Sequence, residues 1–200
     1  DEATSWKQAL SIYLPRVDIR VSLDEGDPAD VEALILWDDF SVLPALTNLK
    51  MVVVLGAGVD HLFESGVTIA KSIQVCRLVN PSITSQMVEW VTLAVLVHNR
   101  FWDEYRSFQR QRLYTELTAL QPSERVIGIL GLGMLGKEVA LTLKKIGYQV
   151  KGWSNSPKMI DQIESFHGSD GLSAVLSEVD IVICMLPLTE HTRGILNLNL

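Results

Sequence analysis

Residues 126–146 read VIGILGLGMLGKEVALTLKKI, and they carry the strongest indication of fold in the chain. Its first five residues are apolar, as expected for a buried strand of a parallel sheet. Gly131, Gly133 and Gly136 follow directly, and the remainder has the apolar spacing of an amphipathic helix. A G-x-G-x-x-G pattern between a strand and a helix is typical of a dinucleotide-binding turn. The alternative is a glycine-rich turn without a ligand.

Each of the three glycines has a physical reason in such a turn. Gly131 permits the tight turn, Gly133 lets the backbone approach a pyrophosphate, and Gly136 lets the helix pack closely on the strand. The phosphates are then expected at the helix N-terminus, where free N–H groups and the helix dipole favour negative charge. The sequence therefore predicts a Rossmann domain, a doubly wound parallel sheet that binds a dinucleotide.

The segment after the next predicted strand indicates which dinucleotide is bound. An Asp or Glu about 20 residues beyond the glycine motif holds the adenosine ribose of NAD. Here the strand is followed by a run without carboxylates that contains Ser154, Asn155, Ser156 and Lys158. Short polar side chains and a lysine can accept a 2′-phosphate, whereas a carboxylate repels it. The pattern favours NADP, with NAD possible. The alternative is a solvated turn with the ribose bound through water.

Composition limits the classes to which the protein can belong. The chain has 200 residues, of which 48% are hydrophobic, and a formal net charge of −7. This predicts a packed core and argues against nucleic acid as the main partner, since phosphate binding needs a basic face. No apolar run approaches the ~20 residues that span a membrane. Cys76 and Cys184 lack metal-ligand spacing, so we expect no metal site and a reducing, cytoplasmic compartment.

Apolar periodicity divides the chain into an N-terminal lobe, residues 1–84, and a connector helix with a second lobe, residues 85–200. Strands are expected at residues 17–21, 33–37, 51–55, 125–130, 149–153 and 180–185, and helices at residues 6–13, 85–112, 134–146 and 172–176. Continuous apolar strands separated by helices predict an α/β fold whose parallel sheets are covered on both faces. The second lobe shows too few strands for a complete domain. We therefore expect the chain to be truncated at its C-terminus and at its N-terminus.

Two loops that follow predicted strands are further candidates. Residues 56–60 read GAGVD, and small residues there expose backbone N–H groups that can hold a carboxylate; a plain turn is the alternative. Residues 186–189 read LPLT at the carboxyl edge of the second sheet, where ligands bind in open α/β folds. Thr189 and Thr192 are expected either to cap the next helix or to touch the cofactor. Asp38 and Asp39 are interpreted as a turn.

Four motifs occur in order along the chain. They are VLGAGVD at residues 54–60, QMVEW at 86–90, IGILGLGMLG at 127–136 and LPLTEHTRGI at 186–195. Together they resemble the D-isomer-specific 2-hydroxyacid dehydrogenase family, most closely its glyoxylate/hydroxypyruvate reductase A branch, over nearly the whole chain. The resemblance implies a flavodoxin-like substrate lobe, a Rossmann lobe inserted into it, a cleft between them and a homodimer. It also implies hydride transfer from a nicotinamide to the carbonyl of a 2-oxoacid.

The resemblance also implies roles for individual residues. The loop at residues 56–60 matches the family's substrate-carboxylate loop, with the Ala57 and Gly58 amides as donors. Trp37 matches an aromatic residue of the substrate pocket, with core packing as the alternative. The implied cofactor-binding residues are Gly131, Gly133, Met134, Leu135 and Gly136 in the pyrophosphate turn, Ser154, Asn155, Ser156 and Lys158 in the phosphate-discriminating loop, and Leu186 and Pro187 beside the adenosine.

The family's chemistry needs an Arg that polarises the 2-oxoacid, a His that delivers the proton and a Glu that raises the pKa of that His. The resemblance implies that all three lie beyond Leu200, so no catalytic residue is assigned within the chain. The four histidines present, His61, His98, His167 and His191, are interpreted as structural or solvated.

These observations predict an NADPH-preferring reductase of glyoxylate, hydroxypyruvate or a similar small 2-oxoacid. An alternative from another class is a dinucleotide-sensing interaction protein, like the corepressors that resemble the same family. That function requires a peptide-docking groove on the first lobe. A third possibility is that this 200-residue chain binds cofactor poorly and catalyses nothing.

Overall fold

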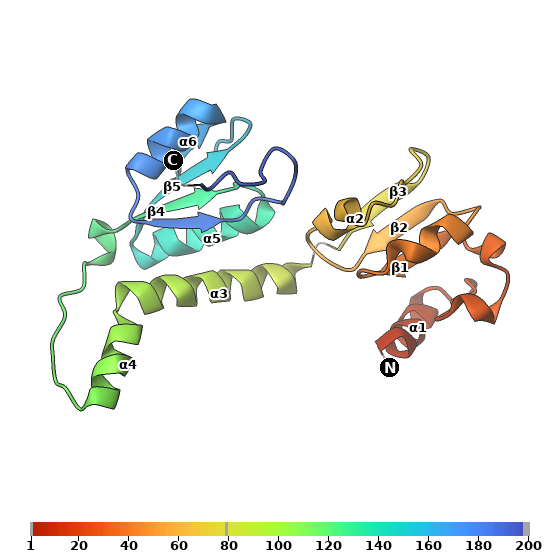
Figure 1. The fold of residues 1–200 in the computed structure, drawn as a ribbon, viewed down its shortest axis with the longest axis horizontal. Helices are drawn as coiled ribbons and strands as arrows, with labels where there is room; N and C mark the ends of the chain where they lie inside the picture. Colours follow the sequence, from red (N-terminus) through yellow and green to blue (C-terminus); the bar gives the residue numbers. More distant parts are fainter. Residues whose placement is uncertain (1, 79, 198–200) are drawn as a thin grey trace. The chain divides into compact units, whose positions relative to one another are not determined.

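The computed structural model describes residues 2–78 and 80–197, and it divides the chain into two compact units, Asp1–Val79 and Asn80–Leu200 (Figure 1). The second unit opens with a helix that begins at Pro81. Its N-cap is Asn80, whose side chain accepts a hydrogen bond from the Ser82 N–H. An Asn cap followed by Pro in the first turn is a standard helix start.

The first unit contains a three-stranded parallel sheet in the order β1-β2-β3. Its elements are α1 (Glu2–Tyr13), η1 (Leu23–Glu25), η2 (Pro28–Asp30), β1 (Ala33–Leu36), η3 (Phe40–Ala45), β2 (Met51–Val54), α2 (Asp60–Glu64) and β3 (Gln74–Arg77). Val52 and Val54 point into a core that they share with Phe40, Leu43 and Leu62. Continuous Val-rich strands thus form the parallel sheet that the sequence predicts.

Two expectations for the first unit are wrong. On the face of the sheet opposite this core, Ile35 is 41% exposed and α1 buries no residue, so the expected cover of both faces is incomplete within the described residues. The alternating segment 17–21 forms no strand, because it pairs with no neighbouring strand. Instead the Arg20 guanidinium donates hydrogen bonds to the Asp18 carboxylate at 2.7 Å and to the Asp27 carbonyl oxygen at 2.9 Å.

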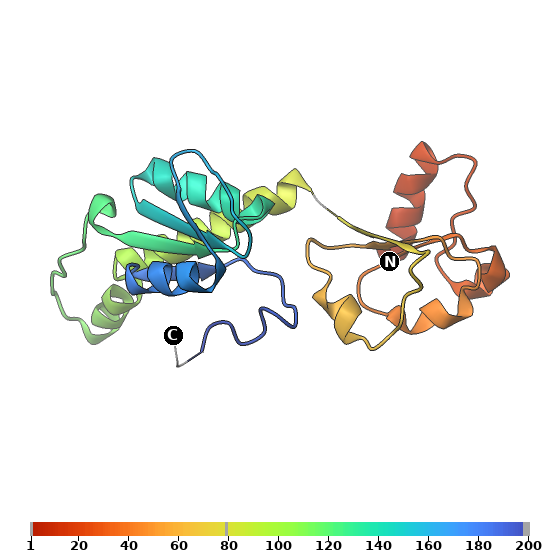
Figure 2. The same cartoon turned by 90° about the horizontal axis from the view of Figure 1, so that it is seen from above.

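The second unit contains a four-stranded parallel sheet in the order β6-β5-β4-β7. Its elements are α3 (Pro81–Asn99), α4 (Trp102–Gln111), η4 (Pro122–Glu124), β4 (Val126–Leu130), α5 (Met134–Ile146), β5 (Gln149–Ser154), β6 (Glu164–His167), α6 (Gly168–Ser177) and β7 (Ile181–Cys184). Helices α3 and α5 cover one face of the sheet and α6 covers the other (Figures 1 and 2). The Rossmann-type layering that the glycine motif predicts is present.

The expectation of a single connector helix over residues 85–112 is also wrong, because α3 and α4 are separate helices. Phe101 between them has a left-handed backbone, with φ 53° and ψ 40°. The end of α3 is held by the buried Asn99, whose amide donates to the Leu120 carbonyl at 3.3 Å and accepts from the Arg125 guanidinium at 3.2 Å. These contacts join α3 to the segment that leads into β4, which fixes where the helix ends.

None of the helices within the described residues is long and apolar enough to cross a membrane. Within the same residues, no group of three or more His, Cys, Asp or Glu side chains is placed to hold a metal ion. Cys76 and Cys184 are both free thiols.

Replacing Tyr148 with Phe is expected to leave the protein as stable as the wild type at pH 7, or more stable by about 1 kcal/mol. The Tyr148 hydroxyl is buried near the Asn99 side chain but makes no well-formed hydrogen bond among the described residues, so removing it removes a desolvation cost. Burial also raises the pKa of Tyr148 above its ordinary value of 10.0. The folded state therefore disfavours the phenolate, and this contribution to stability, complete below pH 10, is lost as the pH rises through the raised pKa.

The measurement is urea unfolding of wild type and Tyr148→Phe at neutral pH and at several values above pH 10. We expect the stability of the wild type to fall more steeply than that of the variant in the alkaline range. A variant that is destabilised by more than about 1 kcal/mol at neutral pH would show that the hydroxyl contributes a hydrogen bond.

Candidate functional site

The turn after β4 needs glycine at its first position. Gly131 has φ +103°, a conformation that L side chains rarely adopt, and its N–H donates to the Trp153 carbonyl at 2.8 Å. A Cβ atom there would lie 2.9 Å from the backbone of Met185 in the segment after β7. The turn is therefore closely held between the ends of β5 and β7.

The other two glycines of the motif differ in what surrounds them. A Cβ at Gly136 would lie 1.9 Å from the carbonyl oxygen of Gly131, so helix α5 can approach the turn only because this residue is glycine. A Cβ at Gly133 would meet no atom within 4 Å. The space beside Gly133 is thus open, as it must be for a ligand to reach the backbone.

The N-terminus of α5 is free to bind an anion. Gly133 is the N-cap and supplies no side-chain cap, and the first turn carries no acidic residue. The N–H groups at the start of a helix have no partner within it, and here they belong to the first-turn residues Met134, Leu135 and Gly136. This arrangement fits the pyrophosphate of a dinucleotide.

A residue that the sequence analysis did not single out holds the turn in place. Leu132, the residue between the first two glycines, is buried, and its side chain fills the space over Gly152 in β5. A Cβ at Gly152 would lie 2.5 Å from the Leu132 side chain. A glycine inside a strand often marks such a close approach, and this was the available signal.

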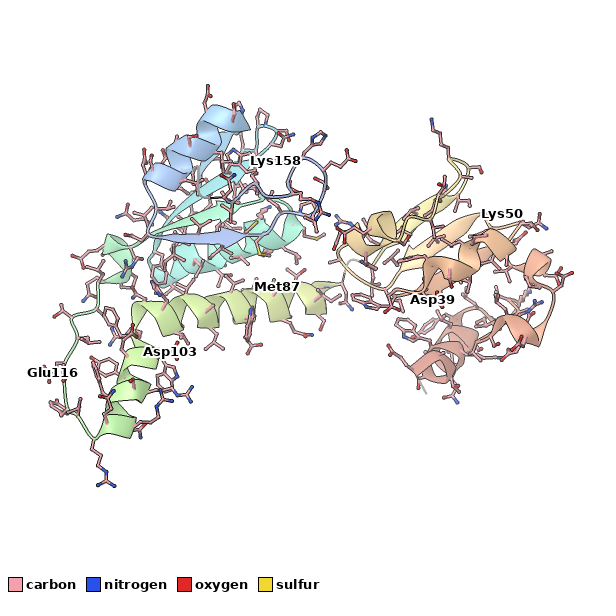
Figure 3. All side chains as sticks on the ribbon, viewed as in Figure 1. Asp39, Lys50, Met87, Asp103, Glu116 and Lys158 are labelled. Atoms are coloured by element: carbon pink, nitrogen blue, oxygen red, sulfur yellow. The ribbon has the colours of Figure 1, made fainter. Side chains whose placement is uncertain are left out.

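The loop after β5 leaves three polar side chains exposed. Ser154 is buried, and its hydroxyl donates to the Ser156 carbonyl at 2.8 Å, so it shapes the loop from within. Asn155, Ser156 and Lys158 are exposed (Figure 3 labels Lys158). Because Trp153 pairs with Leu130 in the sheet, this loop begins beside the glycine turn.

The segment after β7 also reaches this edge of the sheet. Leu186 packs against the core that includes Leu130 and Trp153, while Pro187 is exposed. Thr192 does not cap a helix, and its hydroxyl is turned back onto its own segment. It accepts a hydrogen bond from the Thr189 N–H at 2.8 Å and donates one to the Pro187 carbonyl. No helix follows β7 within the described residues, so the two threonines close a turn on each other.

In the first unit, the loop 56–60 lies at the carboxyl end of β2. Among the described residues, the N–H groups of Ala57 and Gly58 have no acceptor. The Ala57 carbonyl, by contrast, accepts a hydrogen bond at 2.8 Å from the guanidinium of Arg77 at the end of β3. The loop thus presents donors without partners, which fits the carboxylate site expected from the sequence.

Trp37 covers the start of this loop. Its ring lies against Gly56, where a Cβ would come within 2.5 Å of it. The ring is tilted against the imidazole of His61 with centroids 5.2 Å apart, and His61 Nε2 bonds to the Trp37 carbonyl at 2.7 Å. Trp37 is mostly exposed and so is not a core residue. His61 therefore has a structural contact at the edge of the loop.

Asp38 and Asp39 follow β1 at the same edge. Asp39, which Figure 3 labels, accepts hydrogen bonds from the hydroxyl and the N–H of Ser41. These bonds lower the pKa of Asp39 below its ordinary value of 3.8. It is the N-cap of η3. The pair is therefore a turn, as expected from the sequence.

The structure places the predicted site residues in two groups. The glycine turn, the loop after β5 and the segment after β7 share one edge of the second sheet. Trp37 and the loop 56–60 share the carboxyl edge of the first sheet. Arg77, which belongs with this second group, was missed because no local motif announces it.

The chain is similar to known proteins over its whole length. Residues 92–200 match the family described as D-isomer specific 2-hydroxyacid dehydrogenase, NAD binding domain. The chain is 35% identical to a glyoxylate/hydroxypyruvate reductase A from Photorhabdus laumondii, with 100% of the chain and 65% of the relative covered. It is 36% identical to the protein of the same name from Yersinia enterocolitica, again with 65% of the relative covered. The chain thus spans about two thirds of the length of these curated relatives.

The chain is also similar to solved structures of 2-hydroxyacid dehydrogenases. A D-isomer specific 2-hydroxyacid dehydrogenase from Xanthobacter autotrophicus Py2, in complex with NADPH and MES, superimposes with a TM-score of 0.86 at 33% identity. The match covers 98% of this chain and 64% of that one. An NADPH-dependent glyoxylate/hydroxypyruvate reductase from Sinorhizobium meliloti, in complex with NADP and sulfate, gives a TM-score of 0.81 at 31% identity, covering 88% and 55%. These names give no support to the corepressor alternative.

Proposed function

The chain belongs to the D-isomer specific 2-hydroxyacid dehydrogenase family, and from this we propose that the protein reduces small 2-oxoacids to D-2-hydroxyacids with NADPH. Glyoxylate and hydroxypyruvate are the proposed substrates, in keeping with the names of the relatives. The observation that carries the proposal is the glycine turn before α5, which is open beside Gly133 and has unpartnered donors at the helix N-terminus.

The proposed cofactor site follows from these residues. Bound NAD(P)H supplies the hydride for the reduction. The backbone from Gly131 to Gly136 would hold the pyrophosphate, since the N–H groups and the dipole of α5 favour an anion there. Leu186 and Pro187 would flank the adenosine. The fit rests on the close packing at Gly131 and Gly136 and the free space at Gly133.

A preference for NADPH over NADH is part of the proposal. The loop after β5 offers Asn155, Ser156 and Lys158 to solvent and contains no carboxylate as far as Ile160. Ser154 supports the loop through its bond to the Ser156 carbonyl. A lysine and short polar donors suit a 2′-phosphate. The relatives of known structure that bind NADP or NADPH agree with this preference.

The substrate would be held in the first unit by its carboxylate. The free N–H groups of Ala57 and Gly58 supply two neutral donors, and backbone N–H groups in such a loop form an anion-binding concavity. The exposed ring of Trp37 beside Gly56 would contact the remainder of a small substrate. The residues that transfer the proton are expected beyond Leu200.

Assembly and compartment complete the proposal. The resemblance implies a homodimer, and the second unit has exposed apolar side chains that a second copy would cover, among them Trp90, 66% exposed, and Leu93 one helical turn along α3. Two free thiols, Cys76 and Cys184, suit a reducing cytoplasm.

The test is to follow NADPH consumption by the intact protein with glyoxylate, hydroxypyruvate and pyruvate. We expect turnover with at least one of them and a higher kcat/KM with NADPH than with NADH. Equal use of the two cofactors would contradict the interpretation of the loop after β5. Absence of turnover on every 2-oxoacid would contradict the proposed activity, and tight binding of a peptide in its place would favour a corepressor-type function.

A further inference from the structure

Within the described residues, one side chain of β3 forms a hydrogen bond with the candidate carboxylate loop, residues 56–60, and it belongs to Arg77. In the sheet it pairs with Val54, the last residue of β2, so it stands beside the point where the loop begins. Its Nη1 donates to the Ala57 carbonyl oxygen at 2.8 Å, and the next residue, Leu78, donates its N–H to the Gly56 carbonyl at 3.1 Å. The end of β3 therefore holds two successive carbonyl groups of the loop.

The carbonyl that Arg77 holds is in the same peptide unit as one of the proposed substrate donors. The C=O of Ala57 and the N–H of Gly58 are the two ends of one planar group, and every peptide bond described is trans. In a trans peptide these two bonds point in opposite directions. A fixed direction for the Ala57 carbonyl therefore fixes the direction of the Gly58 N–H, on the side away from Arg77.

This constraint matters because the loop is glycine-rich. Gly58 lacks a Cβ, so the backbone on its side of the peptide can adopt many conformations, and the peptide unit can rotate unless something holds it. A charged donor on the carbonyl oxygen makes a stronger bond than a neutral one. It also polarises the peptide, which makes its N–H a better donor to an anion.

The charge of Arg77 is not neutralised by a neighbour. None of the ion pairs within the described residues includes it, and its side chain is exposed. A guanidinium at the carboxyl edge of the sheet favours an anion nearby, whereas the Asp60 carboxylate of the same loop, 2.8 Å from where a Cβ of Gly58 would lie, opposes one.

We propose that Arg77 is a positioning residue for substrate binding, which orients and polarises the Ala57–Gly58 peptide so that the Gly58 N–H binds the carboxylate of a 2-oxoacid. This inference rests on the proposed function and concerns the affinity for the 2-oxoacid, not the hydride transfer or the cofactor.

The experiment compares Arg77→Met and Arg77→Lys with the wild type in the intact protein. Arg77→Met is expected to raise KM for the 2-oxoacid by about 10- to 100-fold, because a charge-assisted bond is lost. The Kd for NADPH should stay unchanged, and kcat should fall much less than KM rises. Arg77→Lys keeps a charged donor and should recover KM to within about fivefold of the wild type.

A matched control tests whether charge alone is responsible. Lys50 directly precedes β2, at the end of the sheet where the strands begin, and it forms an ion pair with Glu32 (Figure 3 labels Lys50). Lys50→Met removes a positive charge from the same unit and is expected to change KM by less than about twofold. Both positions are exposed, so each variant should melt within about 2 °C of the wild type.

The outcomes separate the inference from the proposed function. If the wild type reduces 2-oxoacids and Arg77→Met has an unchanged KM, the inference is overturned and the function stands. If Arg77→Met and Lys50→Met raise KM equally, a general charge effect replaces the positioning role, and the inference is again overturned. If the wild type reduces no 2-oxoacid, the proposed function fails, and the inference fails with it.

Discussion

Gly133→Ala is expected to weaken NADPH binding by about 100-fold while the protein remains folded. An added Cβ meets no atom of the protein within 4 Å, and the backbone of Gly133, with φ −73°, is open to any residue. The methyl group would instead occupy the space through which the pyrophosphate reaches the backbone. Ala is a poorer N-cap than Gly, so a loss of stability of up to about 1 kcal/mol is expected.

The control for this variant is Gly136→Ala. There the Cβ would lie 1.9 Å from the Gly131 carbonyl oxygen, so α5 must move and the unit is destabilised. Thermal unfolding and NADPH titration of both variants separate the two roles: Gly133→Ala loses binding without unfolding, and Gly136→Ala loses stability. Wild-type affinity in a folded Gly133→Ala protein would show that the dinucleotide does not approach this turn.

The glycine turn could be predicted from sequence because its causes are local. A strand, three glycines and a helix follow one another within residues 126–146, and Gly131 and Gly136 are required by atoms that the same short stretch or the adjoining strands supply. The α/β class and the parallel pairing were also predictable, since continuous apolar strands with helices between them are typical of parallel sheets. The strand pairing confirms both.

Elements that depend on distant partners were not predictable. The segment 17–21 alternates like a strand, but alternation does not supply a neighbouring strand, and Arg20 binds Asp18 and the Asp27 carbonyl instead. Strand β6 was missed because its sequence, ESFH, has one large apolar residue and lies at the sheet edge. The break after α3 was missed because apolar periodicity continues across Phe101.

The candidate site shows the same division. The loop 56–60 was recognisable from its small residues, yet the contact that orients it comes from Arg77, 20 residues further along the chain. The packing of Leu132 over Gly152 likewise joins two elements, and only a glycine within a strand hinted at it. Backbone donors can be located from a motif, whereas the side chains that orient them depend on sheet register.

The largest change in cofactor preference is expected from Asn155→Asp. The residue is exposed directly after β5, about where NAD-binding relatives of this fold carry a carboxylate. A unit negative charge some 6 Å from a 2′-phosphate, at an intermediate dielectric, costs roughly 2–3 kcal/mol, which weakens NADPH binding about 100-fold. The same carboxylate can accept hydrogen bonds from the ribose hydroxyls of NADH, which strengthens its binding by about 10-fold.

The ratio of kcat/KM for NADPH to that for NADH is therefore expected to fall by about a thousandfold in Asn155→Asp. Gln109→Glu makes the same amide-to-carboxylate change at an exposed position on α4, outside the glycine turn and the loop after β5, and it should alter the ratio by less than about twofold because salt screens an exposed charge. The NADPH penalty should also shrink as salt is added, since a surface repulsion is screened. An Asn155→Asp protein that still prefers NADPH as the wild type does would place the 2′-phosphate away from this loop, and Lys158 would then have no part in selecting the cofactor.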